Sequence, residues 1–202
     1  QDDLVTIGLP NGIEFYAAAL AIWKLGATPQ PISYRLPDRE RQAIVDLADP
    51  PLVVGVEPGL HGDRPSVPAG FEPDATLDDS PVLPDRTAAS MKAPTSGGST
   101  GRPKIILSGS PATIDPDAAG GFNMGVDGVH LVPGPMYHNA PFMFSVQGLL
   151  KGNHLVVMRR FDASRSLELI ERHRVDWVLM VPTMMLRIWR LPDGERLARD
   201  LS

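Results

Sequence analysis

The chain has 202 residues, of which 43% are hydrophobic and 21% are charged, and it is long enough to bury a core. Its 19 basic and 24 acidic residues give a net charge of −5, which argues against a general nucleic-acid binder. The sequence has no cysteine, so disulfide bonds and thiolate chemistry are excluded. No apolar run approaches the roughly 20 residues of a membrane-spanning helix, and we expect a cytoplasmic enzyme.

Strands and helices alternate in the first part of the predicted structure. Three short apolar segments are strand candidates: 5–7, 27–32 and 52–56. One helix is predicted from about Ile13 to Leu25, and Gly26 is placed as its C-terminal cap. Apolar residues are spread widely around this helix, so we expect it to be largely buried. Pro37 opens a second helix, which ends before Asp49.

A long segment with many prolines, residues 57–86, has few large apolar residues, and we expect an irregular connection over the surface. Residues 88–94 then lead into a glycine-rich stretch at 95–104. An apolar strand at 104–107 leaves that stretch. The small residues of 108–128 favour neither helix nor strand.

The last third again alternates between strands and helices. Strands are predicted at 129–132, 154–158 and 177–181. Helices are predicted at 140–150, 164–173 and 183–191, with Thr183 as an N-cap. This alternation predicts an α/β fold with mostly parallel sheets flanked by helices and right-handed crossovers.

The glycine-rich stretch reads Thr-Ser-Gly-Gly-Ser-Thr-Gly-Arg-Pro-Lys from Thr95 to Lys104. Small residues let a backbone approach a bulky ligand. Backbone N–H groups, hydroxyls and a lysine together suit a chain of phosphates. A flexible linker is the alternative, but linkers do not usually end in Arg-Pro-Lys followed directly by an apolar strand.

Two common glycine loops do not fit this stretch. The Walker P-loop places lysine directly after its last glycine and opens a helix. Here Arg102 and Pro103 separate Gly101 from Lys104, and the next element is a predicted strand. Gly97, Gly98 and Gly101 also lack the spacing of the dinucleotide-binding fingerprint.

The stretch instead resembles the phosphate-binding signature of the adenylate-forming superfamily, which includes acyl-CoA synthetases, aryl-CoA ligases, luciferases and peptide-synthetase adenylation domains. The matching residues are Ser96, Gly97, Gly98, Ser99, Thr100, Gly101, Arg102, Pro103 and Lys104. Gly97 stands where many relatives have serine. Ala93 and Pro94 stand where a larger residue often precedes the loop.

Further segments are similar to the first half of these longer enzymes: 5–15, 25–31, 34–37, 135–138 and 181–183. The resemblance implies that residues 1–202 are the N-terminal part of a large AMP-binding domain, without its C-terminal part and without the small domain. Both ends of the chain therefore look cut, and we expect a longer polypeptide.

The resemblance also implies roles for individual residues. Ser99, Thr100 and Gly101 would wrap the β- and γ-phosphates of ATP, within a loop that includes Ser96, Gly97 and Gly98. Lys104 would contact a phosphate or would brace the loop through a carboxylate. His138 would gate the acyl pocket, or would merely cap the helix near Ala140. Four apolar residues would line an acid channel or pack in the core: Phe142, Met143, Met184 and Met185.

The activity implied is ATP-dependent conversion of a fatty or bulky alicyclic or aryl acid to acyl-AMP and then to acyl-CoA. ATP, Mg²⁺ and CoA are the expected cofactors and co-substrates, with Mg²⁺ held on phosphate oxygens because no metal-ligand cluster is visible in the sequence. The segment alone is expected to be inactive. An adenylation domain for an amino or aryl acid and a non-catalytic nucleotide-binding module are the alternatives, and the oligomeric state stays open.

Overall fold

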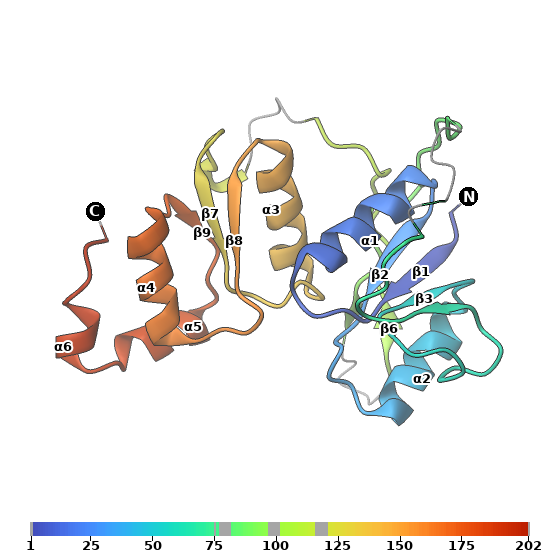
Figure 1. Ribbon diagram of the computed structural model, residues 1–202, viewed down its shortest axis with the longest axis horizontal. Helices are drawn as coiled ribbons and strands as arrows, with labels where there is room; N and C mark the ends of the chain where they lie inside the picture. Colours follow the sequence, from blue (N-terminus) through green and yellow to red (C-terminus); the bar gives the residue numbers. More distant parts are fainter. Residues whose placement is uncertain (1, 75, 77–81, 97–101, 116–120, 202) are drawn as a thin grey trace. The chain divides into compact units, whose positions relative to one another are not determined.

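A computed structural model describes residues 2–74, 76, 82–96, 102–115 and 121–201 of the chain. The chain divides into two compact units, Gln1–Thr113 and Ile114–Ser202. Each unit contains a parallel sheet with helices on both faces (Figure 1), so the predicted α/β fold is confirmed. None of the helices in the described ranges has the length and apolar character that a membrane span requires.

The parallel sheet of the first unit has four strands in the order β2-β1-β3-β4. These strands are β1 (Leu4–Ile7), β2 (Thr28–Pro31), β3 (Val53–Val54) and β4 (Ser66–Val67). The helices α1 (Ile13–Lys24) and α2 (Asp38–Ala48) connect the first three strands. The strand predicted at 52–56 is shorter than expected because Gly55, with φ at 90°, turns the chain beside Gly8. β4 lies inside the connection for which no strand was predicted.

Helix α1 is buried along one face only. Phe15, Ala19 and Ile22 are buried, whereas Leu20 is 42% and Leu25 is 55% exposed. The prediction of a largely buried helix is therefore wrong for this unit. Gly26 does end the helix as predicted, with a left-handed φ of 71°.

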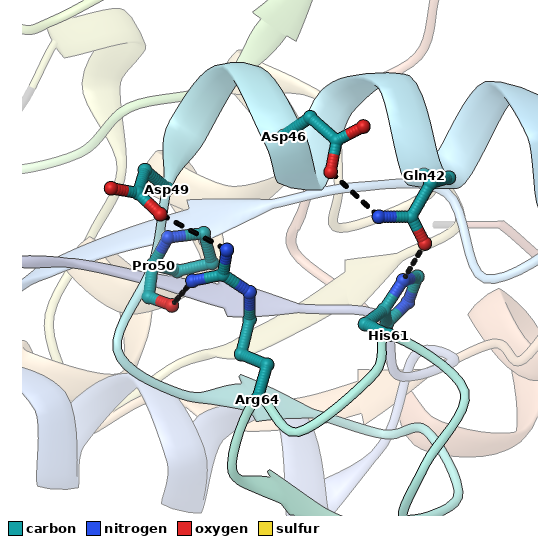
Figure 2. Close-up of polar contacts among 6 residues, drawn as sticks. All are labelled: Gln42, Asp46, Asp49, Pro50, His61 and Arg64. Carbon is teal, nitrogen blue, oxygen red and sulfur yellow. Dashed lines mark hydrogen bonds and ion pairs between the residues drawn. The ribbon is translucent and has the colours of Figure 1, made fainter.

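The proline-rich connection is tied to helix α2 by polar side chains (Figure 2). Arg64 donates to the carbonyl of Pro50 and to Asp49 Oδ1, the latter at 3.0 Å, and so places positive charge at the C-terminus of α2. Gln42 Nε2 donates to Asp46 at 2.6 Å, so Gln42 Oε1 is left to accept from His61 Nδ1 at 2.7 Å. Residues 61–64 are thus held against the helix, although their sequence reads as an irregular loop.

The second unit has a three-stranded parallel sheet in the order β8-β7-β9. Its elements are η1 (Gly121–Asn123), β7 (Val129–Val132), α3 (Asn139–Leu150), β8 (His154–Val157), α4 (Ala163–His173), β9 (Trp177–Val178), α5 (Pro182–Trp189) and α6 (Asp193–Arg196). The predicted strands and helices are confirmed, with β9 shorter than expected. Thr183 is not the N-cap of α5, because Val181 holds that position and Pro182 is the first helical residue.

The two units share one arrangement of strands. In each, the first strand is central, the second lies on one side of it and the third on the other. The two connecting helices lie on opposite faces of the sheet, α1 and α2 in the first unit and α3 and α4 in the second (Figure 1). The carboxyl ends of the parallel strands in each unit therefore meet at one edge, where α/β folds commonly bind ligands.

A histidine is buried between β7 and α3. His130 is 2% exposed, and its ring lies edge-on to Trp177 with centroids 4.5 Å apart. Among the described residues, Nδ1 of His130 has no hydrogen-bond partner. Gly148 on α3 makes room for the ring, because a Cβ at that position would lie 2.6 Å from Nδ1.

Gly148→Ala should lower the free energy of unfolding by about 1–3 kcal/mol, because the added methyl group overpacks the His130 site. Gly194→Ala is the matched control, since a Cβ on that helical glycine of α6 meets nothing within 4 Å. Denaturant unfolding of both variants checks this. In a His130→Ala background, Gly148→Ala should lower the free energy of unfolding much less, because the ring that the added methyl group would contact is gone. Equal stability of the Gly148→Ala and Gly194→Ala variants would contradict the packing.

Burial lowers the pKa of His130 from 6.5 to about 4, against the opposing effect of Asp176. The unfolded chain therefore binds the proton more tightly than the folded chain, and stability falls as the pH drops from 6.5 towards 4. The loss should approach about 3 kcal/mol. In His130→Leu, the free energy of unfolding should change less between pH 6.5 and pH 4 than in the wild type. Denaturant titrations at a series of pH values measure this, and the same pH dependence in both proteins would contradict the burial of His130.

Candidate functional site

The glycine-rich stretch joins two neighbouring strands, and the strand predicted at 104–107 is confirmed but shorter than expected. β5 (Thr95–Ser96) and β6 (Lys104–Ile105) form an antiparallel pair in which Ser96 stands opposite Lys104. The turn residues Gly97, Gly98, Ser99, Thr100 and Gly101 lie outside the described residues, and their phosphate contacts stay predictions. The structure thus defines the two ends of the candidate site.

Backbone hydrogen bonds extend this hairpin beyond its two short strands. The N–H of Ile106 donates to Pro94 at 3.0 Å, and the N–H of Ser108 donates to Lys92 at 3.0 Å. Further from the turn, Met91 donates to Ser110 at 3.0 Å. The chain segments that frame the turn are therefore paired over several residues, which fixes where Ser96 and Lys104 lie.

Strand β2 holds the hairpin at the edge of the parallel sheet. Thr28 and Ile32 donate their N–H groups towards β1, so the backbone groups of the alternate residues, Pro29 and Pro31, face the hairpin. Neither proline has an N–H to donate. The carbonyl of Pro29 accepts from Ala93 at 2.9 Å, but this edge offers no donor for a continuous ladder.

Side-chain donors supply further links between the hairpin and the rest of the unit. Thr28 Oγ1 donates to the carbonyl of Ser90 at 2.9 Å, and Trp23 Nε1 donates to the carbonyl of Met91 at 2.7 Å. Both links lie several residues before the turn. They fix the base of the hairpin rather than the end that carries the site.

A chain of hydrogen bonds reaches the site end through the core. Thr6 Oγ1 donates to Gln30 Oε1 at 2.6 Å, and Gln30 Nε2 donates to Thr95 Oγ1 at 2.7 Å. The side chains of Thr6 and Gln30 are fully buried. These residues were not predicted from the sequence, although polar residues inside predicted strands were a visible sign of a buried polar contact.

Lys104 is exposed, and in the part of the chain that the structure describes no carboxylate forms an ion pair with it. The predicted alternative, in which Lys104 braces the loop through a carboxylate, therefore has no support among those residues. Lys104 stands opposite Ser96 in the hairpin, and an exposed ammonium group at this position suits an external anion. Contact with a phosphate stays a prediction.

His138 lies in the second unit, in the turn that leads from the carboxyl end of β7 into α3. Its N–H donates to the carbonyl of Pro135 at 3.0 Å. Gly134 packs against the ring of Pro141, since a Cβ at Gly134 would lie 2.6 Å from Cγ of that proline. This close contact folds the turn back onto the first turn of α3 and fixes the backbone at His138.

The backbone of His138 occupies the N-cap position of α3, but its side chain makes no capping hydrogen bond. The predicted alternative, in which His138 caps the helix, therefore holds only for its backbone. The residue is exposed, and its ring packs beside that of Tyr137, with the ring centroids 4.6 Å apart. Partial desolvation lowers the pKa of His138, which favours the neutral imidazole. Its gating role at an acyl pocket stays a prediction.

The four candidate channel residues differ in burial. Phe142 is fully buried and packs in the core of the second unit, whereas Met185 is 59% exposed. Met143 and Met184 are half-buried. Core packing thus accounts for Phe142. For the other three residues an acid channel stays a prediction.

No three His, Asp or Glu side chains in the described ranges gather closely enough to hold a metal ion. The site ends offer a hydroxyl at Ser96 and an ammonium group at Lys104, and neither resembles the carboxylate set of a dedicated magnesium site. Any Mg²⁺ would therefore need its ligands from a bound nucleotide and from water.

The chain is similar to several acid–CoA ligases. It is 31% identical over 228 residues to 4-coumarate–CoA ligase 5 of Oryza sativa subsp. japonica, a match that covers 98% of this chain and 41% of that protein. It is 29% identical over 201 residues to a feruloyl-CoA synthase of Amycolatopsis, with 91% of this chain and 40% of that protein covered. The chain therefore spans about 40% of the length of these curated relatives.

Solved structures show the same fold. The inhibitor-bound N-terminal domain of FACL13 from Mycobacterium tuberculosis superposes with a TM-score of 0.71 at 22% identity, covering 100% of this chain and 55% of that chain. The o-succinylbenzoate CoA synthetase of Bacillus subtilis, in complex with its acyl-adenylate intermediate, superposes with a TM-score of 0.74 at 18% identity, covering 97% and 55%. The family model described as AMP-binding enzyme matches residues 1–202. The chain belongs to the AMP-binding enzyme family.

Proposed function

We propose that the protein containing this chain activates a carboxylic acid with ATP and transfers the acyl group to CoA. A carboxylate oxygen attacks the α-phosphorus, and pyrophosphate leaves. The thiol of CoA then attacks the acyl carbon of the acyl adenylate, and AMP leaves. The observation that carries this proposal is the hairpin that sets Ser96 opposite Lys104 at the two ends of the glycine-rich turn, in a chain that matches the family throughout.

Positioning and charge neutralisation do most of the work in such phosphorus chemistry. Hydroxyls and N–H groups of Ser99, Thr100 and Gly101 would hold the β- and γ-phosphates, and Lys104 would supply a positive charge. Mg²⁺, as a hard cation that prefers oxygen, would bind the phosphate oxygens and water. The exposure of Lys104 and its lack of an ion pair among the described residues support this role.

The acid is proposed to be aromatic or otherwise bulky. Relatives that align over nine-tenths of the chain or more carry names for coumarate and feruloyl activation. A ligase named for medium- and long-chain fatty acids, from Mycobacterium tuberculosis, aligns over 52% of the chain at 30% identity. His138, at the carboxyl end of β7, would stand beside the acyl group.

The full-length protein should form AMP from ATP and CoA when it is given certain carboxylic acids from a test panel, but not when it is given others. The panel should hold coumaric, ferulic and benzoic acids, an alicyclic acid and a fatty acid. Acyl-CoA detected by mass spectrometry would separate a CoA ligase from an adenylation domain that serves a carrier protein. Absence of acid-dependent ATP–pyrophosphate exchange with every acid would refute the proposal. Residues 1–202 alone should show no exchange, because they span only about 40% of the length of the curated relatives.

Thr100→Val combined with Lys104→Ala should lower the rate of acid-dependent pyrophosphate exchange by roughly 10²-fold or more, because a hydroxyl and a charge at the phosphates are lost. Circular dichroism and thermal unfolding should stay unchanged. Lys24→Ala, which removes another exposed lysine of the first unit, serves as the control and should leave the rate intact. Unchanged exchange in the double variant would contradict the assignment of the loop.

A further inference from the structure

We infer that Gln30 is a positioning residue for the nucleotide site, acting through Thr95 on the strand that carries Ser96. This inference rests on the proposed function. The amide side chain of Gln30 is fully buried, and it joins the parallel sheet of the first unit to the site end of the hairpin.

The register of the sheet explains how Gln30 reaches the hairpin. Thr6 on β1 and Gln30 on β2 are register partners, so their side chains project from the same face of the sheet. Val53 of β3 is also a partner of Thr6 and packs with Val45 of α2, which identifies this face as the one that α2 covers. Gln30 extends from the edge strand on this face to Thr95.

Hydrogen bonding makes this polar pair acceptable in the core. An amide buried without partners would cost several kcal/mol on transfer scales, but Gln30 accepts from Thr6 and donates to Thr95 at 2.6 and 2.7 Å. The amide therefore has a preferred position. Since Thr95 Oγ1 accepts the second bond, the side chain of Thr95 is held in a matching orientation.

Thr95 is next to Ser96, which pairs with Lys104 across the hairpin. A shift of Thr95 would therefore move both ends of the turn. Sites that position phosphates lose rate steeply when a supporting contact lets them move by a fraction of an ångström. Gln30 supplies such a contact where the proline-bearing edge of β2 cannot supply backbone donors.

The chain contains a matched control for this contact. Thr28 is on the same strand, is 1% exposed and also ties β2 to the hairpin through a side-chain donor. Its acceptor is the carbonyl of Ser90, five residues before Thr95, at the base of the hairpin. Removal of the Thr28 or the Gln30 contact should weaken the same unit, but only the Gln30 contact lies at the site.

The test compares Gln30→Met, Thr95→Val, Thr95→Ser and Thr28→Val in the full-length protein. Met keeps the length of the glutamine side chain without its hydrogen bonds, Val removes the acceptor on Thr95, and Ser retains it. Thermal unfolding gives stability, and acid-dependent pyrophosphate exchange gives KM for ATP, KM for the acid and kcat. Gln30→Met and Thr95→Val should each lower kcat/KM for ATP about tenfold, because both variants lose the hydrogen bond between residues 30 and 95 at the site end. Thr95→Ser should stay within about twofold of the wild type.

Thr28→Val should lose stability but keep the wild-type KM for ATP. If Gln30→Met and Thr95→Val change ATP kinetics no more than Thr28→Val does, Gln30 is only a structural residue and the inference is overturned, while the proposed function stands. If Gln30→Met fails to fold, the comparison of Thr95→Val with Thr95→Ser tests the inference instead, because Thr95 is only half-buried. A wild-type protein without exchange activity on any acid would overturn the proposed function and this inference with it.

Discussion

Two buried side chains, Thr6 and Gln30, connect the central strand of the first sheet to the strand that begins the glycine-rich turn. The site depends on this connection because β2 presents prolines along the edge that faces the hairpin. With no N–H donors on that edge, the hairpin cannot join the sheet as a regular extra strand. Among the described residues, it is instead fixed by a backbone hydrogen bond to the carbonyl of Pro29 and by side-chain donors, of which the Gln30 amide bonds at the site end.

The two units use the same strand arrangement in different ways. In the second unit, the candidate residue His138 lies in the turn at the carboxyl end of the central strand, where parallel sheets commonly place functional groups. In the first unit, Ser96 and Lys104, the two described ends of the phosphate-binding candidate, lie on an antiparallel hairpin held beside the parallel sheet. Paired strands thereby give these two ends a defined position, as a rigid scaffold does for residues that serve a binding site.

Sequence patterns predicted most of the regular elements because apolar periodicity and helix-end residues act locally. The bounds of β7 agree with the prediction, and those of α4 differ by one residue. The two-residue strand β4 was missed because its proline-rich surroundings indicate a loop. The N-cap of α5 was misplaced because a threonine is a stronger N-cap candidate than the valine that holds the position.

The sequence motif predicted which residues form the ends of the candidate site, but it did not predict the hydrogen bonds that hold those ends in place. Gln30 and Thr95 are 65 residues apart in the sequence, and no local sequence pattern predicts which distant hydroxyl group will accept a hydrogen bond from a buried amide. Buried polar contacts of this kind depend on the register of β1 with β2 and on where the hairpin lies. Both are properties of the folded unit.

A crystal structure of the full-length protein with ATP and Mg²⁺ tests the central claim most directly. We expect the triphosphate to lie at the turn between β5 and β6, with the ammonium group of Lys104 within hydrogen-bonding distance of a phosphate oxygen and with Gln30 bonded to Thr95. A triphosphate bound at another place in the protein, with the turn between Ser96 and Lys104 free of ligand, would contradict the account.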